Sequence, residues 1–300
     1  MPPLLQSLVI VNPLSGGGRK PARAERCLRE MGLAREVVHR DNLPGVREMA
    51  RRAVAEGARL IIACGGDGTI NAAVNALAGT DCALAALPCG VGNDIVRSLG
   101  LPPQVERACR LLPSLEPTPI DLVRVNGDGY YVGVGSLGVA AHMAAWVRRR
   151  KGAGPWWALY AASFGRALVD APAPWLEVRA GPYAFRGEAA LAAFANGRLL
   201  GRWFPVAPRA DMADGLIDVC LVAAGGRRRL LRLLAAVPLE RHVGMPGAQF
   251  ARAERVRVSS PGPLEFWADG ELLGTTPLTL EVVRGAVWVM AGREGASTAN

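Results

Sequence analysis

The chain has 300 residues, half of them hydrophobic, with 36 glycines and 22 prolines. This composition predicts a globular α/β protein of one large or two medium domains, and it excludes a disordered chain. The net charge of +9 comes almost entirely from arginine and favours anionic partners such as nucleotide phosphates, nucleic acid or acidic lipid headgroups.

The cysteines and histidines argue against a disulfide-bonded or zinc-binding protein. The six cysteines show no CxxC or CxxH pairing, and the three histidines lie far apart in the sequence. We therefore expect buried thiols in a reducing compartment. We find no apolar run of membrane-spanning length and expect no signal peptide before the first strand. These features predict a cytoplasmic protein and leave open a peripheral contact with the inner face of the membrane.

Apolar runs alternate with helical patterns in the first third of the chain. The predicted strands cover 8–11, 36–39, 60–64 and 83–87, and the predicted helices cover about 20–31, 45–57 and 70–77. Strands that alternate with helices in this way predict a parallel sheet with right-handed crossovers. Ligands of such sheets bind beyond the carboxyl ends of the strands.

Glycine-bearing polar turns follow three of these strands, at 12–18, 65–69 and 88–94. Such turns suit phosphate, because glycine lets the backbone approach an anion and the following helix presents unpaired N–H groups. An ordinary tight turn is the alternative for each, with Asp67 as a helix N-cap. An acid beside phosphate needs a metal or a proton between them, so Asp67 is the most informative residue. The absence of GxxxxGK[ST] excludes a P-loop NTPase.

Short alternating runs replace this pattern after about residue 122. They predict strands over 130–134, 175–179, 189–194, 217–222, 255–258, 264–268, 278–282 and 286–290. Many short strands separated by turns predict an antiparallel sheet or sandwich.

Two helical segments in this part of the chain leave alternatives open. Residues 140–168 carry Trp146, Trp156, Trp157 and Phe164, interrupted by Arg148-Arg149-Arg150-Lys151. They indicate either a buried helix pair with a solvated basic loop or a lipid-facing surface. The segment Arg227-Arg228-Arg229-Leu230-Leu231-Arg232-Leu233-Leu234 begins a basic amphipathic helix. It suits an anionic bilayer or an ordinary position on the protein surface.

Several segments, in order, resemble the diacylglycerol kinase catalytic-domain family, which includes soluble bacterial lipid kinases and sphingosine kinases. NAD kinases and phosphofructokinases resemble it more distantly through GGDGT. The segments are Asn12-Pro13-x-Ser15-Gly16, Gly65-Gly66-Asp67-Gly68-Thr69-x-Asn71, Pro88-x-Gly90-x-x-Asn93-Asp94, Ile120-Asp121-Leu122, Pro208-x-Ala210-Asp211-x-x-Asp214-Gly215-Leu216 and Asp269-Gly270-Glu271. The resemblance covers about residues 8 to 291.

This resemblance implies two domains. The first is an NAD-kinase-like α/β domain with a parallel sheet, residues 1–122, which binds nucleotide and to which strands at about 283–292 return. The second is a β-rich antiparallel sandwich, residues 123–282, which takes the lipid substrate.

The resemblance also implies the site. The nucleotide-binding residues would be Asn12, Pro13, Ser15, Gly16, Gly65, Gly66, Asp67, Gly68, Thr69, Asn71, Gly90, Asn93 and Asp94. A metal would bind Asp211, Asp214 and the backbone carbonyl of Leu216, with Asp121 linking it to the active site through water.

Two acids are candidates for the general base. By resemblance Glu271 takes the proton from the lipid hydroxyl, whereas sphingosine kinases give this role to the GGDG aspartate, here Asp67. The structural alternative for Glu271 is a position beside an ordinary Asp-Gly hairpin turn. For Asp211 and Asp214 it is a turn with self-capping aspartates.

Two positions depart from the family pattern. Val91 stands where the family usually has threonine, and Arg40 or Asp41 occupies the region of another family threonine near the end of the second strand. These departures affect the adenosine side of the site and leave the nucleotide preference open.

We therefore predict an ATP- and Mg²⁺-dependent lipid kinase that phosphorylates a hydroxyl of a diacylglycerol-like or sphingoid-like lipid at a membrane surface. The alternatives are an NAD kinase and a nonenzymatic regulator that binds nucleotide or anionic lipid. Nucleic acid is not an expected partner, because basic and aromatic residues do not interleave in a recognisable module. A homodimer is left open.

Overall fold

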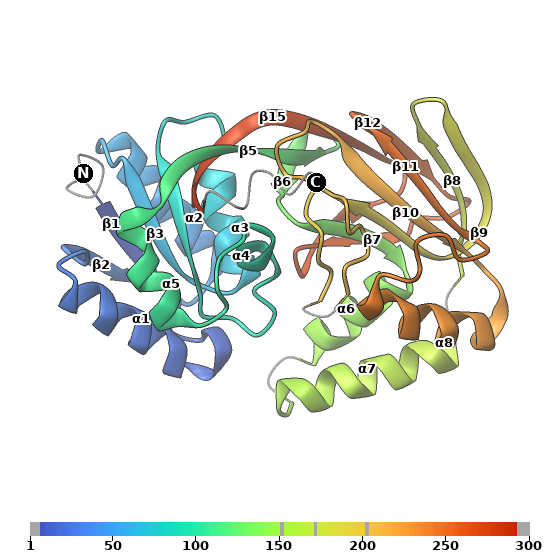
Figure 1. Ribbon diagram of the computed structural model, residues 1–300, viewed down its shortest axis with the longest axis horizontal. Helices are drawn as coiled ribbons and strands as arrows, with labels where there is room; N and C mark the ends of the chain where they lie inside the picture. Colours follow the sequence, from blue (N-terminus) through green and yellow to red (C-terminus); the bar gives the residue numbers. More distant parts are fainter. Residues whose placement is uncertain (1–6, 151–152, 171–172, 202–203, 293–300) are drawn as a thin grey trace. The chain divides into compact units, whose positions relative to one another are not determined.

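The computed structural model describes residues 7–150, 153–170, 173–201 and 204–292 of the chain (Figure 1). The chain divides into two compact units. The N-terminal unit contains Met1–Leu122, Met212–Asp214 and Val283–Asn300, and the C-terminal unit contains Val123–Asp211 and Gly215–Val282. The short Met212–Asp214 segment thus belongs to the N-terminal unit, although the chain on either side of it belongs to the other.

The N-terminal unit is built on a parallel sheet, which confirms the predicted fold class. Its strands β1 (Ser7–Val11), β2 (Glu36–His39), β3 (Leu60–Gly65) and β4 (Ala83–Pro88) lie in the order β4-β3-β1-β2. The last part of β15 (Leu278–Ala291) pairs in parallel with β4. The central strands are buried along their whole length, which explains their continuous apolar runs.

Helices cover both faces of this sheet. They are α1 (Arg19–Glu30), α2 (Leu43–Ala55), α3 (Asp67–Leu77), α4 (Asp94–Ser98) and α5 (Val105–Leu111), with short 3₁₀ turns η2 (Ser15–Gly17) and η3 (Leu112–Ser114). On one face, α1 packs against α5, and Leu28 and Cys109 meet Val9, Ile62 and Ala85 in one buried cluster. On the other face α2 packs against α3.

The C-terminal unit is an antiparallel β structure, as predicted. Its strands are the end of β5 (Glu116–Val125), β6 (Asp128–Tyr131), β7 (Val134–Gly138), β8 (Trp175–Ala180), β9 (Tyr183–Ala195), β10 (Ile217–Ala223), β11 (Ala248–Ala253), β12 (Arg255–Ser259), β13 (Glu265–Ala268), β14 (Glu271–Thr275) and the start of β15. The first half of β9 pairs with β8, whereas its second half pairs with β7 and β10. This long strand therefore joins two sheets.

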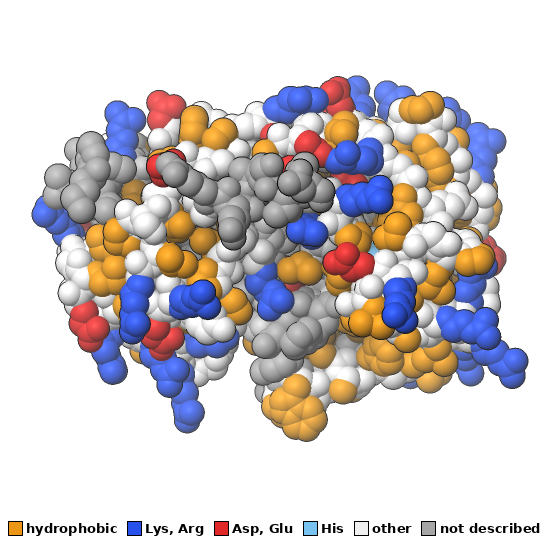
Figure 2. Space-filling view, in the orientation of Figure 1, with side chains coloured by type: hydrophobic (Ala, Val, Ile, Leu, Met, Phe, Trp, Pro, Cys, Tyr) orange, Lys and Arg blue, Asp and Glu red, His pale blue; other side chains and the backbone are white. Residues whose placement is uncertain are grey.

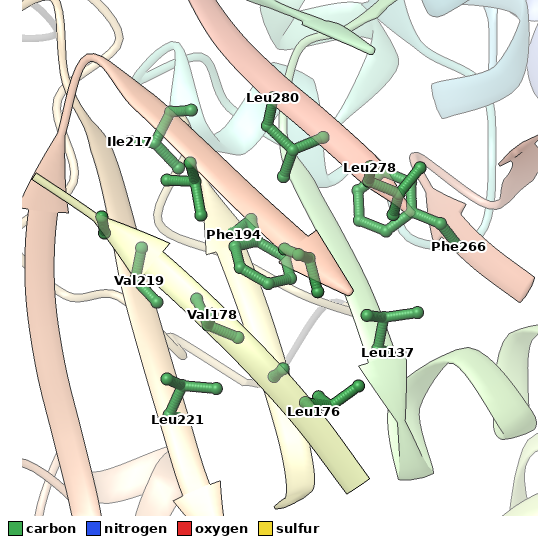
Figure 3. Close-up of a cluster of buried hydrophobic side chains, with 14 of the residues drawn as sticks. Leu137, Leu176, Val178, Phe194, Ile217, Val219, Leu221, Phe266, Leu278 and Leu280 are labelled. Atoms are coloured by element: carbon green, nitrogen blue, oxygen red, sulfur yellow. The ribbon is translucent and has the colours of Figure 1, made fainter. Parts of the chain in front are cut away.

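A large apolar core fills the space between these strands (Figure 3). Phe194 lies in its middle, with the ring centroid of Phe266 6.1 Å away, and Val178, Val219 and Leu280 belong to the same cluster. The sequence predicted a sheet or sandwich here from many short strands separated by turns.

Three helices complete the C-terminal unit: α6 (Val139–Arg149), α7 (Trp156–Asp170) and α8 (Gly226–Ala236), which continues into η4 (Val237–Leu239). α6 packs against β7, β9 and β13, α7 packs against α6, and α8 touches α7. The predicted helix pair with a basic interruption is confirmed, although Lys151 of that run lies outside the described residues. Within the described ranges, every helix is too short or too polar to span a bilayer.

Two predicted strand boundaries are wrong, each for a local reason. The single strand expected at 130–134 is two strands, because the N–H groups of Val132 and Gly133 donate to the carboxylate of Asp269 rather than to a neighbouring strand. The two strands expected at 278–290 are one strand, β15. The chain continues through Gly285, whose N–H donates to the Asp121 carboxylate at 2.7 Å. Strands β5, β11 and β14 were not predicted, and neither were helices α4 and α5.

Candidate functional site

Three loops meet at the carboxyl ends of β1, β3 and β4 in the N-terminal unit. The first link between them is a buried hydrogen bond in which Asn12 Nδ2 donates to Thr69 Oγ1 at 3.0 Å. The other side of the same amide accepts from the N–H of Leu14 at 3.1 Å, which shapes the first loop. Asn12 and Thr69, predicted from separate motifs, thus hold the first loop against the start of α3.

Glycine is required where the loops touch. A Cβ on Gly90 would lie 2.5 Å from the Cα of Gly66, and a Cβ on Gly16 would lie 2.2 Å from the carbonyl oxygen of Cys89. Gly16 also has a left-handed φ of 55°, which side chains rarely adopt. These glycines therefore let three backbone turns pack directly on one another. The result is a surface made mainly of main-chain atoms, as a phosphate site needs.

Asn93 shapes the third loop from within. It has a left-handed φ of 55° and a buried side chain, which accepts from Gly90 N–H at 2.8 Å and donates to the carbonyls of Pro88 and Gly90. Asparagine suits this position because it tolerates the left-handed region and offers both a donor and an acceptor. The structure shows its side chain bonded within the turn.

Asp67 is the first residue of α3, and the N-cap is Gly66, so the interpretation of Asp67 as an N-cap is wrong. Its carboxylate instead reaches the third loop, where Oδ1 accepts from the N–H of Ile95 at 3.0 Å. Burial raises the pKa of Asp67 above its ordinary value, while the amides of Ile95, Asn93 and Asp94 act in the opposite direction. The acid is therefore held among backbone N–H groups in the middle of the loop cluster.

Lys20 belongs to the same cluster, although the sequence analysis did not include it among the site residues. Its Nζ donates to the carbonyl oxygen of Gly90 at 2.8 Å, so its ammonium group lies between the start of α1 and the third loop. A lysine two residues after a run of three glycines, in a chain with only two lysines, is the signal that points to it.

The other predicted nucleotide-binding residues occupy the same edge of the sheet. Pro13 is exposed, Ser15 begins η2, Gly65 ends β3 against the Thr69 side chain, Gly68 lies in the first turn of α3, and Asp94 begins α4. Asn71 is buried within α3, where its side-chain oxygen accepts from Asn75 at 3.0 Å. Asn71 thus lies inside the helix packing.

The two positions that depart from the family pattern lie near this edge. Val91 is partly buried in the third loop. Arg40 follows β2, and its guanidinium donates to the carbonyl of His39 at 2.8 Å. The Arg40 guanidinium therefore lies against the end of β2.

Asp121 is a buried acid that ties separate segments of the N-terminal unit together. Its carboxylate accepts from Gly285 N–H at 2.7 Å, and its own N–H donates to the Met212 carbonyl at 2.6 Å. These bonds hold the Met212–Asp214 segment and β15 in the N-terminal unit.

The predicted metal ligands lie beside this segment. Asp211, Asp214 and Leu216 are each partly buried, and Gly215 has a φ of 77°. Within the described ranges, no three or more His, Cys, Asp or Glu side chains are grouped to hold a metal ion. The predicted ligand set contains only two acids, completed by a carbonyl.

Glu271 lies in the C-terminal unit, directly after the turn of the β13–β14 hairpin. Asp269 and Gly270 form its two-residue turn with φ values of 50° and 80°, which is the pattern of a type I′ turn. The Asp269 carboxylate accepts from the N–H groups of Val132 and Gly133 at 2.7 and 2.9 Å. The turn is therefore anchored through Asp269 to the segment between β6 and β7, which positions the start of β14.

An arginine of α6 holds the Glu271 side chain. Arg148 Nη2 lies 3.0 Å from Glu271 Oε2, and both side chains are partly exposed. The sequence showed Arg148 only as one of a basic run, because nothing in that run indicates which arginine meets an acid more than a hundred residues away. Asp67 and Glu271, the two candidate bases, thus belong to different units.

Comparisons with known proteins agree with this division. Residues 6–125 match the family model described as "Diacylglycerol kinase catalytic domain", and residues 133–291 match "YegS C-terminal NAD kinase beta sandwich-like domain". A Mycobacterium tuberculosis protein named "Diacylglycerol kinase" is 29% identical over 294 residues, which cover 95% of each chain. A Yersinia enterocolitica protein named "Probable lipid kinase YegS-like" is 27% identical over 286 residues, covering 94% of this chain and 95% of that protein.

A solved structure shares the fold. The crystal structure of a diacylglycerol kinase from Bacillus anthracis aligns with a TM-score of 0.78 and 22% identity, covering 96% of this chain and 97% of the other. The two family models together span nearly all the described residues. The chain therefore belongs to the kinase family in which a diacylglycerol kinase catalytic domain is followed by a YegS-type C-terminal domain.

Proposed function

We propose that the protein transfers the γ-phosphoryl group of ATP to a hydroxyl group of a diacylglycerol-like lipid. The observation that carries the proposal is the cluster of glycine loops, in which Gly16, Gly66 and Gly90 make backbone contacts that no side chain permits and Lys20 adds a positive charge. Phosphoryl transfer depends on such positioning and charge neutralisation. The names of the relatives favour this reaction over an NAD kinase or a nonenzymatic regulator.

The loop residues fit a nucleotide phosphate group with Mg²⁺. Asp67 is partly exposed, and its ionised carboxylate would attract a hydrated cation placed beside the backbone amides that already donate to it. Bound Mg²⁺ would neutralise charge on the transferred phosphoryl group. The backbone amides and Lys20 would hold the phosphate oxygens. The set Asp211, Asp214 and the carbonyl of Leu216, with Asp121, stays a prediction for a second metal.

Glu271 is the better of the two candidate bases. Asp67 is engaged by the amide of Ile95, which suits a positioning or metal-facing role. Glu271 stands at a rigid hairpin with its carboxylate held by Arg148. In the proposed step the lipid O–H proton passes to the Glu271 carboxylate, the hydroxyl oxygen bonds to the γ-phosphorus, and ADP leaves.

The proposal is tested by incubating the protein with labelled ATP, Mg²⁺ and separate acceptors. The acceptors are diacylglycerol, monoacylglycerol, sphingosine and NAD, and the products are separated by thin-layer chromatography. A labelled phospholipid from diacylglycerol supports the proposal. Label on NAD alone, or on no acceptor, contradicts it. The cytoplasmic location, the sphingoid alternative and a homodimer stay predictions.

A further inference from the structure

Helix α7 of the C-terminal unit exposes apolar side chains along its length. Trp157 is 62% exposed and Val169 is 60% exposed, with Tyr160 also exposed between them. Ser163 and Ala167 form its buried side, so this apolar surface is additional to the face that packs on the protein. A helix that is apolar nearly all round normally has a second apolar surface to contact.

The few charges on α7 lie at its end and neutralise each other. Arg166 and Asp170 are the only charged residues of the helix, and they form an ion pair. His142 Nε2 of α6 lies 3.4 Å from Asp170 Oδ2. No net charge therefore opposes burial of the exposed apolar side.

Helix α8 lies beside α7 and adds positive charge. Arg227 of α8 donates to the Val169 carbonyl of α7 at 3.2 Å, which fixes the two helices together. Leu230 and Leu233 point inward and are buried, whereas Leu231 is 48% exposed between the exposed Arg228 and Arg232. The helix contains four arginines and no acid.

Together these side chains form what we call the α7–α8 surface, defined by Trp157, Tyr160, Val169, Arg228, Leu231 and Arg232. Figure 2 shows hydrophobic side chains gathered over the region where Figure 1 draws α7 and α8, with Lys and Arg side chains at its border. Tryptophan and tyrosine prefer the boundary between lipid headgroups and acyl chains, and arginine is attracted to anionic lipid.

We propose that the α7–α8 surface docks on an anionic lipid bilayer. The proposal rests on the proposed function, because a kinase of membrane lipids must meet a bilayer, and it names the face that does so. A second copy of the chain is a poorer occupant, because the arginines of two facing α8 helices would repel each other. From the sequence, the 140–168 segment could be either a buried helix pair or a lipid-facing surface. Helix α7 has a buried side and an exposed apolar side, and the proposal assigns the exposed side to lipid.

The docking helices connect to the proposed base within the same unit. α7 packs on α6, and Arg148 near the end of α6 pairs with Glu271. The proposed membrane-contacting helix α7 and the arginine that holds the proposed base Glu271 therefore belong to one packed group of helices.

Sedimentation with sucrose-loaded vesicles tests the charged part of the surface. Arg228→Gln combined with Arg232→Gln removes two charges one helical turn apart. At about 1 kcal/mol for each arginine, binding to phosphatidylglycerol-containing vesicles should weaken about thirtyfold at low salt. The matched control is Arg47→Gln combined with Arg51→Gln on α2, which removes two exposed charges at the same spacing in the N-terminal unit. The control should bind like wild type.

A second pair of variants tests the apolar part. Trp157→Ala combined with Leu231→Ala should weaken binding about tenfold or more at both low and high salt, because apolar burial is not screened. The control is Trp288→Ala, which removes a 38% exposed tryptophan from β15 in the N-terminal unit. Circular dichroism establishes that each variant is folded.

The outcomes separate this proposal from the proposed function. If docking is right, both α7–α8 variants lose phosphorylation of vesicle-embedded diacylglycerol but keep it with dispersed short-chain diacylglycerol. If both variants sediment with vesicles as strongly as the wild-type protein does, docking is overturned. Docking is also overturned if the protein forms a stable dimer that Trp157→Ala dissociates while vesicle binding persists. If wild type sediments with anionic vesicles but phosphorylates no lipid, docking stands and the proposed function fails.

Discussion

Asp67 combines a partly buried position with a charge that the proposed reaction needs. Burial raises its pKa from an ordinary value of 3.8, so the folded protein holds the Asp67 proton more tightly than the unfolded chain does. As pH rises above 3.8, the unfolded chain releases this proton first, and stability falls until the folded pKa is passed. Once it is ionised, the Asp67 carboxylate therefore costs stability. Its retention fits a role in binding a cation.

We predict that Asp67→Asn separates stability from activity. Asparagine keeps an oxygen for the Ile95 amide but removes the charge, so the melting temperature should stay equal or rise by a few degrees. Turnover with Mg-ATP should fall by about two orders of magnitude or more. Calorimetry and the kinase assay measure the two effects.

The companion variant Asp67→Ala removes the acceptor as well. It should lower stability by about 1–3 kcal/mol, because the amide of Ile95 loses its partner. A melting temperature of Asp67→Asn as low as that of Asp67→Ala would contradict the assignment of the charge as the destabilising feature.

Glu271→Gln should lower turnover by about two to four orders of magnitude, because glutamine keeps the shape but cannot accept the hydroxyl proton. ATP affinity, measured by calorimetry, should barely change, since the proposed nucleotide site belongs to the other unit. Near-normal turnover in Glu271→Gln, together with complete loss in Asp67→Asn while ATP still binds, would assign the base to Asp67.

The loop cluster depends on backbone contact between whole turns. We predict that Gly90→Ala weakens both ATP binding and folding, because its Cβ would lie 2.5 Å from Gly66 Cα and 2.9 Å from Asn93 Oδ1. The turns must separate, which distorts the amide groups of the proposed phosphate site. The expected loss is about 1–3 kcal/mol of stability and at least tenfold in ATP affinity.

The control for this variant is Gly262→Ala in the C-terminal unit, where a Cβ meets no atom within 4 Å. It should match wild type in both measurements. ATP affinity of Gly90→Ala equal to that of Gly262→Ala would remove the third loop from the nucleotide site.

Buried thiols should make the folded protein sensitive to alkaline pH. Burial raises the pKa of Cys82 to about 11 and of Cys89 and Cys220 to about 12, from an ordinary value of 9.0. Burial also raises the pKa of Cys64 and of Cys109 well above this value. Above pH 9 the unfolded chain releases these protons while the folded protein keeps them. Their contribution to stability is thus intact below pH 9 and is lost as pH rises toward 11–12.

We predict that the free energy of unfolding, measured with urea, is about 7 kcal/mol lower at pH 10 than at pH 8. Each of the five thiols accounts for about 1.4 kcal/mol over this interval, because the unfolded chain passes its thiol pKa of 9.0 midway. Cys220→Val should reduce this loss by about one fifth. Equal stability of wild type at the two pH values would show that these thiols are accessible to solvent.

The spacing of apolar residues identified most strands and helices in order, because each element carries its apolar residues at the period of a helix or in the run or alternation of a strand. The buried strands β1, β3 and β4 read as apolar runs, and the glycine turns after them indicated where the loops would meet. Candidate residues such as Asn12 and Thr69 followed from local motifs, and the parallel sheet carries both to one edge.

Only the tertiary structure shows which distant groups become partners. Lys20 with Gly90, Asp67 with Ile95, and Arg148 with Glu271 depend on packing between segments that no local pattern relates. The sequence by itself thus determined the fold class and the edge of the sheet where the loops meet. Both follow from local signals, because apolar runs mark buried strands and glycine-rich segments mark turns. The partners of the charged groups, the continuity of β15 and the exposed side of α7 were decided only when the chain folded, because each depends on which surfaces other segments cover.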